Sequence, residues 1–262
     1  MKKNLIKVMA CSVVVMMIMP LAACTDNEEG DITLNISASS VLTDALAEVN
    51  DVYMQKNSDI KIASNFTSAG TIQSQIENGA DCDVFFSANV RNMDNLENKG
   101  LIISDTRKSV LSNLLVLIVP ASSSKGINTF TDLLKENVEL VAIGDTSTVS
   151  AGIYSEKLFK LLEIYDRLSA KFISASNVRE VLTYVETGNV DAGLVFMSDA
   201  LTSNKVVVVD TAPDEINSQI VITAAIVSAS KNVDAASDYL AFLSGAEALA
   251  IFEKYGFSSA VE

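Results

Sequence analysis

The sequence lacks histidine and tryptophan, and it has only three cysteines among its 262 residues. Without histidine, a Ser-His-Asp or Cys-His catalytic arrangement and an imidazole metal ligand are both excluded. Three cysteines cannot build a disulfide framework. The formal net charge of −14 makes a polyanion such as nucleic acid an unfavourable partner. We therefore expect no histidine-dependent enzyme and no nucleic-acid partner. We also predict no cofactor and no bound metal cation.

Apolar material is abundant. Hydrophobic residues make up 49% of the chain and charged residues 20%, which supports a sizeable core and argues against disorder. The length allows one large domain or two lobes of about 110 to 120 residues each.

The first 23 residues have the pattern of a lipoprotein signal peptide. Three lysines lie within residues 1–7, residues 8–19 are nearly all apolar, and the run Leu-Ala-Ala-Cys at 21–24 resembles a bacterial lipobox. An ordinary signal peptide or a membrane anchor with an incidental cysteine is the alternative. We predict cleavage before Cys24 and attachment of a lipid to its thiol.

The predicted mature chain begins at Cys24, and residues 24–30 form a polar, acidic tether. Cleavage would leave Cys82 as the only thiol, and we expect it to act as a small buried apolar residue. No second apolar run reaches 18 residues. We expect an exported protein that its lipid holds on the outer face of the cell membrane or in the periplasm.

Strand and helix patterns alternate along the rest of the chain. Strands are predicted at 32–36, 60–66, 84–86, 114–119, 139–143, 192–196, 206–209 and 220–227, and helices at 41–56, 69–78, 90–99, 151–162, 178–186, 234–243 and 246–254. This alternation predicts an α/β fold with parallel sheets, in which ligands bind at the carboxyl ends of the strands.

Four of the strand-to-helix junctions share a composition of small and hydroxyl-bearing residues, at 37–41, 66–71, 144–152 and 174–180. Small side chains let a ligand approach the backbone, and the N–H groups and dipole at a helix start favour an anion. Capping of the helices is the alternative, and Asn177 and Glu180 have the spacing of a capping box. Asp81 and Asp83 suggest either a metal site or a turn before a strand.

The ordered motifs resemble the molybdate-binding proteins of ABC importers. The resemblance covers the whole mature chain and rests on segments 37–46, 66–70, 75–88, 142–145, 151–154, 177–179, 193–200 and 251–257.

This resemblance implies a bilobal periplasmic-binding-protein fold of type II, with residues 31–111 plus 223–262 in lobe one and 112–222 in lobe two. Two crossover segments, 114–119 and 220–227, would join the lobes. The implied function is capture of a tetrahedral oxyanion, molybdate or tungstate, and its delivery to the membrane permease of an ABC transporter. The protein would act as a monomer and catalyse no reaction.

In this family backbone N–H groups, two serine hydroxyls and one tyrosine hydroxyl hold the anion. Here Val41, Ala69 and Phe196 stand at the three hydroxyl positions, with Ser40 and Ser68 one residue earlier. The resemblance therefore implies a site formed by Ser39, Ser40, Val41, Ser68, Ala69, Ala151, Val178 and Phe196.

Three alternatives stay open on the residues alone. The same scaffold could bind a different oxyanion or a small carboxylate. An exported enzyme could use the carboxylate of Asp81 or Asp145, although no clear acid pair is present in a motif. A surface lipoprotein with an adhesive role is the third.

Overall fold

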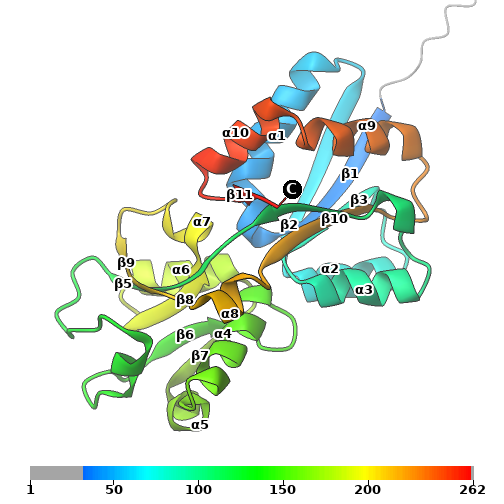
Figure 1. Ribbon diagram of the computed structural model, residues 1–262. Helices are drawn as coiled ribbons and strands as arrows, with labels where there is room; N and C mark the ends of the chain where they lie inside the picture. Colours follow the sequence, from blue (N-terminus) through cyan, green and yellow to red (C-terminus); the bar gives the residue numbers. More distant parts are fainter. Residues whose placement is uncertain (1–31, 261–262) are drawn as a thin grey trace, which may run out of the picture. The chain divides into compact units, whose positions relative to one another are not determined.

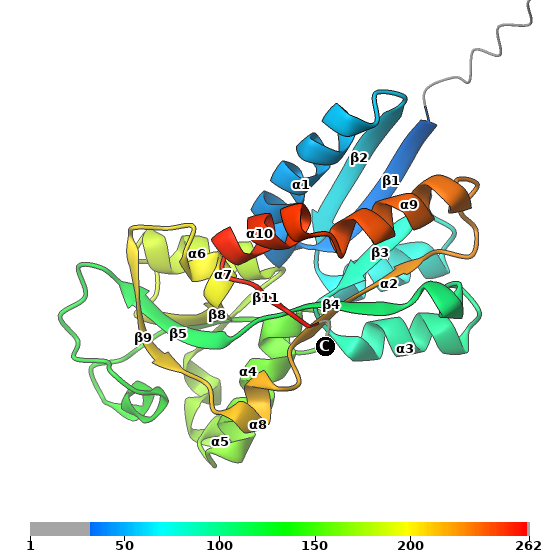
Figure 2. The same ribbon diagram turned by 45° about the horizontal axis from the view of Figure 1, so that its top comes forward.

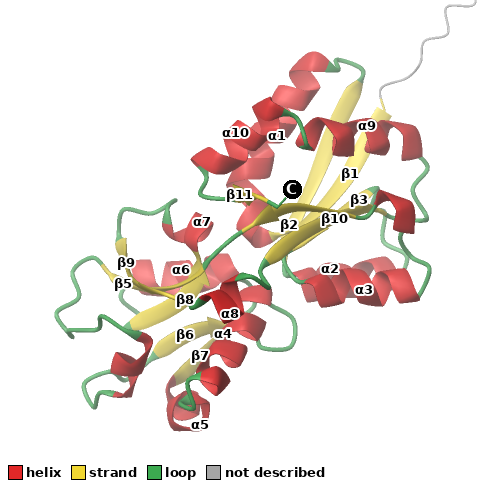
Figure 3. Cartoon of the chain, in the orientation of Figure 1, coloured by secondary structure: helices red, strands yellow, loops and turns green. Residues whose placement is uncertain are grey.

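The computed structural model describes residues 32–260 (Figure 1). The predicted signal peptide, the tether and the lipidated Cys24 lie outside this range. Within it, strands and helices build two α/β lobes, each around its own sheet (Figure 3).

Lobe one contains a six-stranded sheet in the order β11-β4-β10-β3-β1-β2. Its strands are β1 (Ile32–Ser39), β2 (Ile60–Thr67), β3 (Val84–Ser87), β4 (Lys108–Ser112), β10 (Val221–Ile226) and β11 (Ser258–Ser259). Its helices are the 3-10 helix η1 (Ser40–Leu42), α1 (Thr43–Lys56), α2 (Ala69–Glu77), α3 (Val90–Asn98), η2 (Ser104–Thr106), α9 (Val233–Leu243) and α10 (Ala246–Lys254).

Lobe two contains a five-stranded sheet in the order β7-β6-β8-β5-β9. Its strands are β5 (Leu115–Pro120), β6 (Val141–Gly144), β7 (Phe172–Ala175), β8 (Ala192–Phe196) and β9 (Val206–Thr211). Its helices are η3 (Phe130–Leu134), α4 (Ser150–Leu161), α5 (Tyr165–Leu168), η4 (Ser169–Lys171), α6 (Val178–Glu186), α7 (Met197–Ala200) and α8 (Asp214–Asn217).

The expectation of parallel sheets is wrong in part, because both sheets are mixed. Strands that follow one another through a helix run parallel, as β1 does with β2 and β3, and as β6 does with β7 and β8. By contrast, β5 and β10 enter their sheets directly from the other lobe and pair antiparallel with both neighbours. A right-handed helical crossover enforces parallel pairing only between strands that it joins.

The two passages between the lobes are hydrogen-bonded to each other. Asn113 N–H donates to the Ile220 carbonyl at 3.3 Å, and Leu115 N–H donates to the Asn217 side chain at 2.9 Å. The strands of the lobe-one sheet lie within residues 32–112 and 221–259, and those of the lobe-two sheet lie within residues 115–211. The lobe boundaries at 111/112 and 222/223 remain a prediction.

Helices cover both faces of the lobe-one sheet (Figure 2). Consecutive residues of β3 point to opposite faces, so Phe86 packs with the apolar faces of α1 and α9, while Phe85 packs with α2 and α3. Cys82 is a free, buried thiol in the second of these clusters, as expected, and burial raises its pKa to about 11. Its burial makes it a packing residue.

Among residues 32–260, no single helix is long and apolar enough to cross a membrane. The bent pair α9 and α10 passes that test only when the two helices are taken together. Both bury apolar residues in the core of lobe one, including Tyr239 and Phe252.

Gly152 allows α4 to begin directly against the end of β6. A Cβ atom on Gly152 would lie 2.1 Å from the carbonyl oxygen of Gly144, which is backbone and cannot rotate away. We expect Gly152→Ala to lower the free energy of unfolding by about 1–3 kcal/mol, as overpacking does. Urea unfolding, followed by circular dichroism, measures the change.

Gly245→Ala is the matched control, because its Cβ would meet a single atom, the Phe242 carbonyl oxygen, at 3.1 Å. Equal midpoints for the two variants would contradict the close approach of α4 to β6.

Candidate functional site

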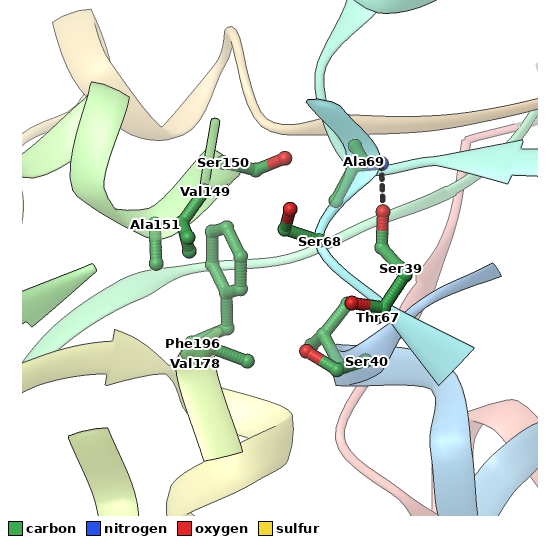
Figure 4. Close-up of a pocket in the computed structure, with 12 residues that line it drawn as sticks. Ser39, Ser40, Thr67, Ser68, Ala69, Val149, Ser150, Ala151, Val178 and Phe196 are labelled. Carbon is green, nitrogen blue, oxygen red and sulfur yellow. Dashed lines mark hydrogen bonds between the residues drawn. The ribbon is translucent and has the colours of Figure 1, made fainter. Parts of the chain in front are cut away.

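Four helix starts meet at one pocket between the lobes (Figure 4). From lobe one come the ends of β1, β2 and β3 and the starts of η1 and α2, and from lobe two come the starts of α4 and α6 and the end of β8. The residues that line the pocket are Ser39, Ser40, Val41, Thr67, Ser68, Ala69, Ala88, Val149, Ser150, Ala151, Val178 and Phe196.

All eight residues that the sequence predicts for the site are among these twelve. Their role in binding a ligand remains a prediction. The sequence reasoning missed Thr67, Ala88, Val149 and Ser150 as lining residues. Three of them lie in junctions that the composition had singled out, so the signal was present, but it did not show which side chains face inward.

None of the twelve lining residues carries a charge. Within residues 32–260 no group of three or more Asp, Glu, His or Cys residues could hold a metal ion. The pocket therefore offers polar groups of two kinds only, the serine and threonine hydroxyls and the backbone amides.

Two of the hydroxyls are used within lobe one. Ser39 Oγ accepts a hydrogen bond from Ala88 N–H at 3.1 Å and so links the end of β1 to the segment after β3 (Figure 4). Ser68 is the N-cap of α2, and its Oγ accepts a hydrogen bond from Thr71 N–H at 3.2 Å. The same Ser68 Oγ lies 2.7 Å from Thr71 Oγ1. If the Thr71 hydroxyl donates in this contact, the Ser68 proton is left for a ligand.

Backbone donors are also present at the helix starts. The first N–H groups of an α-helix have no acceptor inside the helix. Ala69 is the first residue of α2, Ala151 the second of α4 and Val178 the first of α6. The N-cap of α4 is Val149, whose side chain cannot accept a hydrogen bond from the first N–H groups of the helix. These N–H groups and the positive end of the helix dipole therefore face the pocket without a capping side chain.

The lobes touch through backbone beside the pocket. Gly70 N–H, in α2, donates to the carbonyl of Thr148, in the loop before α4, at 3.0 Å. A Cβ atom on Gly70 would lie 2.8 Å from Thr148 Cα, so the contact requires glycine. This hydrogen bond holds the two lobes together at the edge of the site.

A side-chain network makes a second link. Arg179 in α6 forms an ion pair at 2.5 Å with Asp44 of α1, in the other lobe, and its Nε lies 2.9 Å from Asp199 without an aligned hydrogen bond. Asp199 is fully buried, and burial raises its pKa to about 7, although Arg179 opposes the shift.

The carboxylates considered for catalysis do not meet at the pocket. Asp145 Oδ1 accepts from the backbone N–H groups and hydroxyls of Ser147 and Thr148, and the hydrogen bond from the Ser147 hydroxyl is the largest cause that lowers its pKa. It shapes the loop before α4. Asp81 lines other pockets, away from the twelve residues.

Two smaller expectations have clear outcomes. Asp83 accepts from Asn35 N–H at 2.7 Å and from the Ser230 hydroxyl at 2.5 Å, so it ties loops to β1, as the turn interpretation predicts. The capping box at α6 is incomplete: Asn177 caps Glu180 N–H, but the Glu180 carboxylate binds Ser176 N–H instead.

Comparisons with known proteins agree with this architecture. Residues 34–258 match the family model of the bacterial extracellular solute-binding proteins. The chain is 36% identical to YvgL of Bacillus subtilis, over 91% of this chain and 93% of YvgL. YvgL carries a provisional name as an ABC transporter substrate-binding lipoprotein.

Two further proteins are similar along nearly their whole length. The molybdate-binding protein ModA of Escherichia coli is 35% identical over 88% of this chain and 90% of its own. The structure of the periplasmic molybdate-binding protein of Azotobacter vinelandii superposes with a TM-score of 0.77 at 20% identity, over 86% of this chain and 98% of that one. The second likeness establishes the bilobal fold.

The contact at Gly70 makes a testable prediction. In Gly70→Ala the new methyl group pushes the Thr148 backbone away and weakens the hydrogen bond between the lobes. Exchange of the residue 70 amide hydrogen should become roughly 2- to 10-fold faster, which corresponds to loss of one ordinary hydrogen bond. Gly245→Ala is again the control, and an unchanged exchange rate in Gly70→Ala would argue against the contact.

The buried Asp199 predicts a dependence of stability on pH. Its folded-state pKa of about 7 lies above the ordinary value of 3.8, so between these values the folded chain holds a proton that the unfolded chain has lost. Its contribution is complete below pH 4 and is lost as the pH rises through 7. The melting temperature of Asp199→Asn should therefore fall less between pH 5 and 8 than that of the wild type.

Asp44→Asn is the control, since it removes the more exposed carboxylate beside the same arginine. Parallel curves for wild type and Asp199→Asn would show that Asp199 keeps its charge throughout this range.

Proposed function

The chain belongs to the family of bacterial extracellular solute-binding proteins, and from this premise we propose that it captures a tetrahedral oxyanion, molybdate or tungstate, for an ABC importer. The observation that carries the proposal is the uncharged pocket at the meeting point of four helix starts. The molybdate-binding name of the similar Escherichia coli protein supports the choice of anion.

The pocket suits a small anion because the first N–H groups of its helices are donors that have no acceptor inside the helix. Backbone N–H groups of α2, α4 and α6 and the positive ends of these helices favour negative charge. Hydroxyls add donors whose direction adapts to the oxygen atoms. Neutral donors also leave the anion free to dissociate, which delivery to a permease requires.

We expect binding to involve movement of the lobes, because the pocket is small. The pocket has room for about one water molecule. A tetrahedral oxyanion has five heavy atoms and needs more room. A hinge at the two passages near Asn113 and Ile220 would widen the pocket without disturbing either sheet.

The selectivity of the site would come from its hydroxyls and its size. Val41, Ala69 and Phe196 line the pocket and carry no hydroxyl. Phe196 is buried, and its ring packs edge-on to Tyr154 at 6.5 Å between centroids. The remaining donors would then distinguish molybdate from sulfate or from a small carboxylate, which stay the alternative ligands.

The proposed setting follows from the same relatives. A lipid on Cys24 would hold the protein outside the cell membrane, near the permease that receives the anion. The lipobox-like run and the lipoprotein name of the Bacillus subtilis relative support this placement. We propose a monomer without catalytic activity, since the similar proteins are binding proteins and the two candidate carboxylates lie apart from the pocket.

Thermal unfolding with a panel of anions tests the proposed function. A ligand at 100 times its dissociation constant adds about 2.7 kcal/mol of stability, which raises the melting temperature of a chain of this size by roughly 5–10 °C. Molybdate and tungstate should produce this shift, and sulfate and phosphate much smaller ones. The measurement is made at equal ionic strength, so that general salt effects cancel.

The same panel identifies the alternatives. A larger shift with sulfate, phosphate or a carboxylate such as acetate would assign the pocket to that ligand. No shift with any of them at millimolar concentration would end the proposal of an anion site.

A further inference from the structure

Ser150 is a pocket residue with an unusual hydroxyl. It is the first residue of α4, only 5% of it is exposed, and its Oγ has no hydrogen-bond partner within residues 32–260. Buried hydroxyls in folded proteins nearly always have a partner, because an unpaired one costs free energy. The unpaired hydroxyl therefore needs an explanation.

Capping does not explain it. The N-cap of α4 is Val149, and no side chain caps this helix. By comparison, Ser68 caps α2, and Ser155, also in α4 and fully buried, donates to the Ala151 carbonyl at 2.7 Å. Ser150 is thus the buried serine of α4 whose hydroxyl is left over.

The surroundings determine what kind of partner would fit. Figure 4 shows the Ser150 hydroxyl directed across the pocket, toward the side that carries Ser68 and Ala69. The first-turn N–H groups of its own helix, including that of Ala151, have no acceptor inside the helix and can only donate. A group that satisfies the hydroxyl and these amides together accepts several hydrogen bonds, as the oxygen atoms of an oxyanion do.

We propose that the Ser150 hydroxyl donates a hydrogen bond directly to the bound oxyanion. The inference rests on the proposed function and adds a specific ligand-binding residue to it. Lobe two contributes five residues to the pocket, and Ser150 is the one among them that has a hydroxyl. Its bond would tie the anion to lobe two, and the first N–H groups of α2 in lobe one, including that of Ala69, would hold the opposite side.

The test compares Ser150→Ala with Ser155→Ala, which removes a buried hydroxyl from the same helix. Calorimetric titration with molybdate gives the dissociation constant, and a melting curve without ligand gives the stability of each variant. Loss of a hydrogen bond to a charged group should weaken binding by Ser150→Ala roughly 10- to 100-fold. Its melting temperature without ligand should stay the same or rise, because the alanine removes an unpaired polar group.

Ser155→Ala should show the reverse, a lower melting temperature and nearly unchanged affinity, because its hydroxyl bonds within the helix. Ser150→Thr keeps a hydroxyl at the same place and should recover most of the lost affinity. Titration with tungstate and sulfate in parallel shows whether the hydroxyl contributes equally to each anion.

Three results would overturn the inference in distinguishable ways. If the wild type binds molybdate and Ser150→Ala binds it with the same dissociation constant, Ser150 does not belong to the site, while the proposed function still holds. A Ser150→Ala variant that loses stability and affinity together, as a misfolded pocket would, and that Ser150→Thr does not rescue, would assign Ser150 a structural role. Absence of oxyanion binding by the wild type would overturn both proposals.

Discussion

The structure of the site depends on one property of the α-helix, that its first N–H groups have no acceptor within the helix. Helices from both lobes begin at the same pocket, so their unused donors face a common space. Carboxylate side chains in this space would accept hydrogen bonds from these N–H groups and leave no donors for a ligand. The chain instead places small residues and hydroxyls at these positions, which leaves the donors available and the pocket uncharged.

Close approach of backbone segments is the second requirement. Gly152 lets α4 start against the end of β6, and Gly70 lets α2 reach the loop before α4 across the boundary between the lobes. Each position excludes a methyl group because the nearest atoms belong to backbone. The same small residues that open the helix starts to a ligand thus also bring those starts together.

Charged groups surround the pocket without entering it. Asp145 holds the loop before α4 through hydrogen bonds to Ser147 and Thr148, and Arg179 connects α6 to Asp44 in the other lobe. The buried Asp199 completes that network, with its raised pKa. In a chain of net charge −14, this arrangement keeps carboxylates out of a site that we propose binds an anion.

From the sequence by itself came most of the strands and helices, the span 178–186 of α6 and, through the family resemblance, eight of the twelve residues that line the pocket; β4, β7 and β11 were not predicted. The elements could be predicted because periodicity and junction composition are local features of short stretches of chain. Only the tertiary structure decided the antiparallel pairing of β5 and β10, which arrive from the opposite lobe. It also decided which hydroxyls are already used: the Ser39 hydroxyl accepts from the N–H group of Ala88, 49 residues away, whereas the Ser150 hydroxyl has no partner among residues 32–260. Hydrogen-bond partners distant in sequence meet only in the folded chain, and no local pattern records them.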